Sequence, residues 1–356
     1  MKGLLLACLL ASLQTMTVAR AYEADIHYST TYVLARAAGW TGADALTIAS
    51  ANQGVDENQD TVAALEVDSI SNSLHQAEKN LRLHCFSNAH GESRGVSADV
   101  RKLVARHFAE VADRDEDPRA NARRLIALGA ALHCQQDAHA HVGFGGSCGS
   151  HSGSCFGHTY ETFLDQVVFR VLKKHYFDPD HPGVSGERLL EALQGTVSEL
   201  VAHRQETSTR SIAASELVAL ADALRGSGLE LPHELRRECN RYIAGKWLHD
   251  FFRSRSLTLK SPDKLERLAP EVAITCKNAA LDSSVVVRIP EPRFPRMNPD
   301  AAPSLVRADG TYQLAGQEGV DYETREPRVY LSHWRQLVAL PLMTQVALVS
   351  ADSKAR

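Results

Sequence analysis

The sequence predicts an all-α protein, with a multi-helix domain followed by an irregular C-terminal extension. Apolar residues recur at three- and four-residue spacing through most of the chain up to about residue 280, which is the period of a helix with one buried face. Breaker-rich stretches separate these segments, and no β-hairpin pattern or internal repeat stands out before residue 280. The chain has 356 residues, 44% of them hydrophobic, which is enough to bury a sizeable core.

The periodic segments give the expected helices in chain order: 28–38, 42–51, 98–112, 119–141, 158–175, 186–203, 209–224 and 233–252. Thr41 precedes the second segment as a cap residue, and Pro118 opens the fourth after an acidic run. The breakers at 178–183, 226–228 and 261–263 separate the later helices.

The two ends of the chain differ from the middle. Residues 1–21 follow the pattern of a secretory signal peptide, with Lys2, an apolar run over 4–13 and a small-residue cleavage site at 19–21. We therefore expect an exported protein, periplasmic or secreted, that starts at about Tyr22. Residues 22–280 form the helical domain. Residues 281–356 are proline-rich and then polar, and we interpret them as an extension of unknown role that packs on the helices.

Composition excludes some partners. The formal net charge of −4 offers no basic field for duplex nucleic acid or an anionic membrane. Phosphodiester chemistry stays open, because bound metal ions supply positive charge locally. The seven cysteines include Cys8 in the leader, so six remain in the mature chain. In an oxidising compartment an even number suggests disulfides. We favour the pairs Cys148–Cys155 and Cys239–Cys276.

One predicted helix carries a group of metal-binding side chains. His133, Asp137 and His141 lie at i, i+4 and i+8, within an arc of roughly 80°, so they share one helical face. Imidazole and carboxylate are ordinary zinc ligands. His139 lies off that face and is a weaker candidate. The alternative to a metal site is that His133 and Asp137 are an exposed pair of polar residues on a solvated helix face.

A second group follows a glycine-rich loop. His158 and Glu161 are at i and i+3, and the glycines between 143 and 157 allow this helix to return beside the first. The alternative is a polar junction in which Glu161 only favours the start of a helix. Further candidates stand near the mature N-terminus, namely Asp25, His27, Asp56 and His84. Each of these could instead be an ordinary buried histidine or a turn aspartate.

The order of these groups resembles the bacterial zinc-dependent phospholipases C, whose fold is shared by the single-strand-specific nucleases of fungi and plants. The closest match is LIALGAALHCQQD at 125–137 followed by GHTYETFLDQ at 157–166. The resemblance covers about residues 22–176.

The resemblance implies an all-helical domain with two or three zinc ions in a cleft. One zinc ion would have four ligands: Asp56, His84, His133 and Asp137. A second, bridged by Asp137, would lie near His27 and the mature N-terminus. The third would have three ligands: His141, His158 and Glu161. Asp56 would also be catalytic, because it would orient or deprotonate the water that attacks phosphorus.

The sequence departs from that family at two places. Members begin with a tryptophan whose backbone binds metal, whereas this chain is expected to begin at Tyr22, only five residues before His27; Tyr22 or Asp25 would have to substitute. The spacing of His141, His158 and Glu161 also differs from the family's. Cys85 and Cys134 each follow a candidate histidine, so they could pair with each other; the alternative is thiolate ligation of zinc.

These features together predict an exported zinc-dependent phosphoric diester hydrolase of the phospholipase C type. The expected substrate is a phospholipid or nucleotide phosphodiester, with transient contact to a membrane surface and no stable protein partner. One alternative is single-strand nuclease or 3′-nucleotidase activity on the same fold. Another is a non-catalytic exported protein in which the metals are structural.

Overall fold

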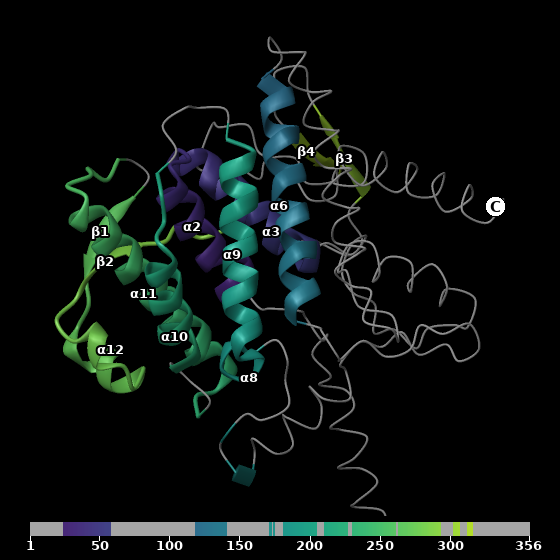
Figure 1. The fold of residues 1–356 in the computed structure, drawn as a ribbon. Helices are drawn as coiled ribbons and strands as arrows, with labels where there is room; N and C mark the ends of the chain where they lie inside the picture. The colour runs from purple at the N-terminus through teal and green to yellow at the C-terminus, as the bar shows by residue number, and fades with distance from the viewer. Residues whose placement is uncertain are drawn as a thin grey trace, which may run out of the picture.

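The predicted class is confirmed in the part of the chain that the structure describes. The computed structural model describes residues 24–57, 118–140, 171–172, 174, 181–204, 210–226, 230–260, 263–292, 302–306 and 312–315. Helices account for most of these residues, and the strands are short (Figure 1). No helix within these ranges is long and apolar enough to cross a membrane.

The elements follow one another along the chain as short and long helices with four strands. The helical elements are η1 (Asp25–Thr30, a π-helix), α2 (Thr31–Ala38), α3 (Gly42–Glu57), α6 (Pro118–Ala140), α8 (Pro182–Ser185), α9 (Glu187–Ala202), α10 (Ala214–Gly226), α11 (His233–Ser254), α12 (Pro270–Thr275) and η2 (Ala279–Leu281). The strands are β1 (Lys264–Arg267), β2 (Val285–Arg288), β3 (Ala302–Val306) and β4 (Tyr312–Ala315).

The helix starts follow local capping chemistry. At the start of α3, the backbone N–H of Asp44 donates to Thr41 Oγ1 over 3.1 Å, and the Thr41 hydroxyl donates to the Asp44 carboxylate over 2.7 Å. Pro118 opens α6, as predicted. The prediction for α10 started too early: residues 210–213 are not helical, and the helix begins where Glu216 accepts the backbone N–H of Ala213 at 2.8 Å.

Helix α6 lies between α3 and α9 and contacts both (Figure 1). The contact with α3 is unusually close at Gly129. A Cβ atom there would lie 2.4 Å from the carbonyl oxygen of Ile48 and 2.7 Å from the Cβ of Ala51, so only glycine allows this approach. The close packing fixes the middle of α3 against α6, one turn before Asp56 on α3 and one turn before His133 on α6.

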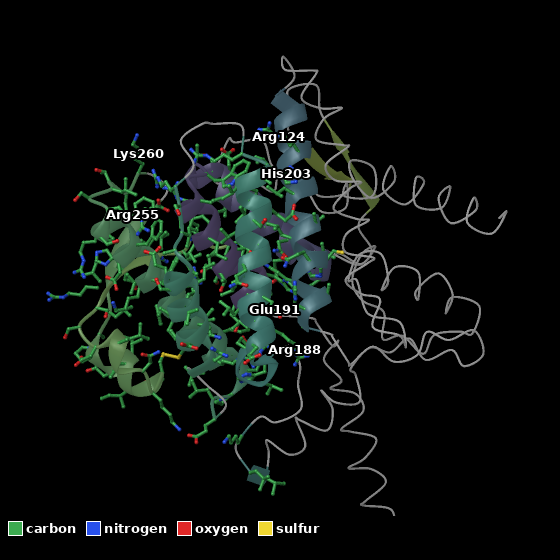
Figure 2. The ribbon with its side chains drawn as sticks, viewed as in Figure 1. Arg124, Arg188, Glu191, His203, Arg255 and Lys260 are labelled. Carbon is green, nitrogen blue, oxygen red and sulfur yellow. A yellow bond between two sulfur atoms is a disulfide. The ribbon has the colours of Figure 1, made fainter. Side chains whose placement is uncertain are left out.

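The C-terminal end of α6 is joined to the start of α9. The guanidinium of Arg188 donates to the carbonyl oxygen of Ala140 over 2.8 Å, and Glu191 lies one turn further along α9 (Figure 2). His139 pairs with Glu191, with His139 Nδ1 3.4 Å from the carboxylate oxygen. The Arg188 contact satisfies a helix-end carbonyl that has no partner within its own helix.

A small sheet packs on α11. Strands β1 and β2 pair antiparallel, with Lys264 opposite Arg288 and Arg267 opposite Val285. No β-hairpin pattern stands out before residue 280 in the sequence, and it gave no sign of β1 at 264–267. Gly245 of α11 makes room for the sheet, since a Cβ there would lie 2.3 Å from the carbonyl oxygen of Val287. The sheet thus joins residues on either side of the predicted boundary at 280–281.

The rest of the extension also contains paired strands. β3 and β4 form a second antiparallel sheet with an irregularity between Ala302 and Leu305. These two strands are the described elements of the chain after residue 292.

A disulfide and a group of hydrogen bonds to Asp263 connect the segments after α11 to the helices. The predicted disulfide between Cys239 and Cys276 is present and joins α11 to the end of α12. Asp263, just before β1, accepts hydrogen bonds from the Tyr32 hydroxyl at 2.6 Å and from Arg36 Nε at 3.0 Å. Cys134 is also disulfide-bonded. Its predicted partner Cys85, and the predicted pair Cys148 and Cys155, lie outside the described residues.

Candidate metal centre

His27 is carried by the π-helical turn η1. In this turn the hydroxyl of Thr30 donates to the backbone carbonyl oxygen of Asp25 over 2.7 Å. The hydroxyl of Thr31 donates to the backbone carbonyl oxygen of Ile26 over 3.2 Å. Both bonds reach back five residues, so they support the wider turn. π-Helical turns are uncommon in proteins, and those that occur often lie at functional sites. This π-helical turn carries the imidazole of His27, which is fully buried.

The other members of the group come from two long helices. Asp56 lies in the last turn of α3, while His133 and Asp137 lie one turn apart on α6. All three are at most 1% exposed. The predicted spacing of His133 and Asp137 therefore does place both side chains on one face, and that face is turned into the protein. Buried charged groups need partners or a metal ion to offset their desolvation.

Three of these side chains, those of His27, Asp56 and His133, form a group that could hold a metal ion, and Asp137 contacts its two histidines. Ligand atoms of His27, Asp56 and His133 all lie within 4.8 Å of one another. Asp137 contacts both imidazoles: its Oδ1 is 3.1 Å from His27 Nε2 and its Oδ2 is 3.0 Å from His133 Nε2. Asp56 contacts the same two nitrogens, at 3.9 Å from His27 and 3.5 Å from His133.

These separations suit a metal ion. Tetrahedral zinc with bonds of 2.0–2.1 Å places its ligand atoms about 3.4 Å apart. The four nitrogen–oxygen distances, between 3.0 and 3.9 Å, surround that value. The donors are imidazole nitrogens and carboxylate oxygens, which are the types that zinc accepts. The group could therefore hold a metal ion.

The electrostatics of the group without a metal are those of a buried ion pair. Burial alone would lower the pKa of His27, but the negative charges of Asp137 and Asp56 and the hydrogen bond to Asp137 outweigh it and raise that pKa to about 9. Burial would raise the pKa of Asp137, but His133 and His27 hold it well below its usual range. A proton on His27 thus takes the place that a metal ion would fill.

Two of the weaker candidates point elsewhere. Asp25 accepts a hydrogen bond of 2.6 Å from Asn240, and the guanidinium of Arg236 lies 3.8 Å away, so Asp25 faces α11. His139 faces α9 through Glu191. Five further predicted ligands lie outside the described residues: Tyr22, His84, His141, His158 and Glu161.

Sequence reasoning missed the polar residues that surround His27. Gln136 accepts a hydrogen bond from His27 Nδ1 at 2.8 Å, and it is fully buried beside Asn52 and Thr31. The available signal was the pair Gln135–Gln136 between His133 and Asp137, in a helix expected to be buried. A buried amide requires hydrogen-bond partners, and thereby indicates a polar network.

Comparison with known proteins adds one match. Residues 23–153 match the model of a family of unknown function (DUF6765). That segment contains His27, Asp56, His133 and Asp137. No curated protein and no solved structure matches the chain.

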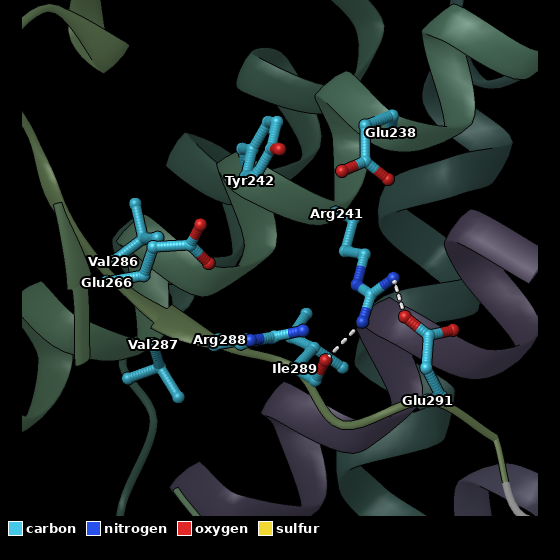
Figure 3. Close-up of a pocket in the computed structure, with 9 residues that line it drawn as sticks. All are labelled: Glu238, Arg241, Tyr242, Glu266, Val286, Val287, Arg288, Ile289 and Glu291. Carbon is cyan, nitrogen blue, oxygen red and sulfur yellow. Dashed lines mark hydrogen bonds and ion pairs between the residues drawn. The ribbon is translucent and has the colours of Figure 1, made fainter. Parts of the chain in front are cut away.

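A hollow of about 200 Å³ lies apart from this group, between α11 and β2 (Figure 3). Its lining mixes both signs of charge. Arg241 pairs with Glu291 at 2.6 Å. Burial, and to a lesser extent the negative charges of Glu238 and Glu266, raise the pKa of Tyr242 to about 12. Arg241 is thus occupied within the protein.

Proposed function

We propose that the chain is an exported, zinc-dependent hydrolase of phosphoric diesters, with His27, Asp56, His133 and Asp137 at its metal centre. The observation that carries the proposal is the group formed by His27, Asp56 and His133, together with the contacts of Asp137 to both histidines. They come from η1, α3 and α6, are buried, and have ligand-like separations. They are also the described residues to which the resemblance assigns the ligands of two neighbouring zinc ions.

The roles of the residues follow from their contacts. His27 and His133 present Nε2 to the same two carboxylates. Asp137 directs one oxygen to each histidine, so it would contribute to the same centre as both imidazoles. When bound, the metal supplies a Lewis acid that polarises a phosphoryl oxygen and makes water acidic near neutral pH. Asp56 faces the same point and would accept the proton of the attacking water.

A second candidate function is a structural metal in a non-catalytic protein. The complete burial of all four side chains favours it, because structural sites are closed while catalytic sites keep an open coordination position. The two functions predict different results when substrates are tested, although both predict bound metal.

Elemental analysis of the purified mature protein tests the metal centre. We expect at least one zinc ion per chain in the wild type and a loss of zinc in the double variant His133→Ala, Asp137→Ala. The matched control is His203→Ala with Glu199→Ala, a half-buried i,i+4 pair on α9 with a separation of 3.4 Å. Zinc retained in the first variant, or absent from the wild type after incubation with zinc, would contradict the proposal.

Activity assays then separate the functions. The hydrolase predicts zinc-dependent cleavage of phospholipid or nucleotide phosphodiesters that is lost in the first double variant and retained in the control. Preference for choline phospholipids supports the phospholipase C type, and preference for single-stranded nucleic acid supports the nuclease type. A zinc-loaded protein that cleaves none of them supports the structural metal. Export is supported by the Cys239–Cys276 disulfide.

A further inference from the structure

The amide of Gln136 occupies the centre of a buried hydrogen-bond network around His27. Its oxygen accepts from His27 Nδ1 at 2.8 Å and from Asn52 Nδ2 at 3.0 Å. Its nitrogen donates to the hydroxyl oxygens of Thr31 at 2.9 Å and Thr196 at 3.0 Å. All five side chains belong to residues that are fully buried. The network therefore joins η1, α2, α3, α6 and α9 around one ring nitrogen.

The two hydroxyls determine which way the amide faces. Each threonine has a single hydroxyl hydrogen. Thr31 donates its hydrogen to the carbonyl oxygen of Ile26 at 3.2 Å. Thr196 donates its hydrogen either to the backbone carbonyl oxygen of Ala192 at 2.8 Å or to the side-chain amide oxygen of Gln135 at 3.2 Å. Both hydroxyl oxygens are then acceptors toward Gln136, so they face the NH₂ group of the Gln136 amide. The oxygen of that amide therefore faces His27.

An oxygen that faces Nδ1 requires a hydrogen on Nδ1. In a neutral imidazole the other nitrogen, Nε2, then keeps its lone pair. Nε2 is the atom that lies 3.1 Å from Asp137 and 3.9 Å from Asp56. The hydrogen bond on one side of the ring thus selects the atom available to a metal on the other side.

We propose that Gln136 is a positioning residue that holds His27 in the Nδ1–H tautomer, so that Nε2 is its metal-binding atom, and that Thr31 and Thr196 hold Gln136. This inference rests on the proposed metal centre. It also extends the centre to α9, because Thr196 lies outside the segment that matches the family model.

The experiment compares zinc affinity, measured by competition with a chromophoric chelator, in variants of two neighbouring glutamines. Gln136→Leu removes the acceptor for His27. Gln135→Leu is the matched control, since Gln135 is equally buried but bonds only to Ala192 and Thr196 of α9. We expect zinc affinity to fall roughly 10- to 100-fold in Gln136→Leu. We expect it to change little in Gln135→Leu.

Nitrogen-15 spectra of ring-labelled histidine provide a direct readout. In the zinc-loaded wild type we expect His27, assigned through its loss in His27→Gln, to show a protonated Nδ1 and a metal-bound Nε2. If Gln136→Leu fails to fold, Thr196→Val serves as the second variant, with an expected affinity loss of several-fold. Unchanged affinity in these variants, or zinc bound through Nδ1, would overturn the positioning role while leaving the metal centre intact. A wild type that binds no zinc would instead overturn the proposed function.

Discussion

The imidazoles of His27 and His133 stack, with ring centroids 4.1 Å apart and planes inclined by 30°. One ring comes from the π-helical turn η1 and the other from the middle of α6. Both Nε2 atoms face Asp56 and Asp137, so the stack brings two imidazoles and two carboxylates together inside the protein. Two imidazolium ions at this separation would repel each other strongly in a buried site. A divalent cation would balance the charge without that repulsion.

Removal of the metal is expected to destabilise the fold. A ligand that binds only the folded state contributes about 4 kcal/mol when present at 1,000 times its Kd. For a domain of this size, that corresponds to a melting temperature roughly 8–16 °C lower after chelation. Differential scanning calorimetry with zinc and with excess chelator measures the shift. The variant with His133→Ala and Asp137→Ala is the control and should melt at the same temperature in both conditions; an equal shift there would locate the metal elsewhere.

The close contact of α3 with α6 makes Gly129 a sensitive position. A Cβ atom at this residue would lie 2.4 Å from the carbonyl oxygen of Ile48 and 2.9 Å from the backbone nitrogen of Asn52, so the helices must separate. We expect Gly129→Ala to cost roughly 1–3 kcal/mol of unfolding free energy and to weaken zinc binding, because Asp56 moves with α3. Chemical denaturation and chelator competition measure the two effects.

Gly226→Ala is the control for this prediction. A Cβ atom at Gly226, at the end of α10, would meet nothing within 4 Å. We expect that variant to be as stable as the wild type and to bind zinc normally. Equal behaviour of the two variants would show that α3 and α6 tolerate a larger separation than their backbone contact indicates.

The long helices α6 and α11 were located from sequence by their length and by the breakers and helix-start residues beside them. They begin within a residue of the starts predicted for 119–141 and 233–252. The strand β1 was not predictable, because its four residues Lys264–Arg267 are mostly charged and exposed. It is a strand only because β2 pairs with it, and that pairing depends on the tertiary fold.

The residues of the candidate site also fall into those that sequence could identify and those that depend on the tertiary fold. His133 and Asp137 could be found from their spacing on one helix. That Asp25 would face Asn240 rather than the metal group depends on where α11 packs, which no local pattern encodes. The role of Gln136 also depends on the positions of Thr31 and Thr196, which come from other helices. Local spacing thus reveals ligands on one helix, while their supporting contacts require the assembled fold.

The ion pair between Arg36 and Asp263 is expected to stabilise the attachment of the β1 segment to α2. Both side chains are at most 8% exposed, and Asp263 also accepts the Tyr32 hydroxyl. Asp263→Ala leaves a buried guanidinium without its carboxylate, which typically costs about 3–5 kcal/mol. The control is Asp222→Ala at the exposed Asp222–Arg225 pair, where the expected loss is under about 1 kcal/mol. Urea denaturation measures both, and similar small losses would contradict a stabilising role for the buried pair.

Zinc binding is expected to release protons. In the metal-free protein, Asp137 and Asp56 raise the pKa of His27 to about 9 despite its burial, so His27 is protonated at pH 7.5. Because that pKa lies above the ordinary value of 6.5, the resulting stabilisation is fully present below pH 6.5 and is lost as the pH rises through about 9.

A metal ion needs the Nε2 lone pair of His27 and must displace this proton. We therefore expect about one proton to be released per chain at pH 7.5, and progressively fewer above pH 9. Isothermal titration of chelator-buffered zinc, in two buffers that differ in ionisation enthalpy, gives the number of protons. If the heat is the same in both buffers at pH 7.5, His27 is neutral before binding, or zinc does not use its Nε2.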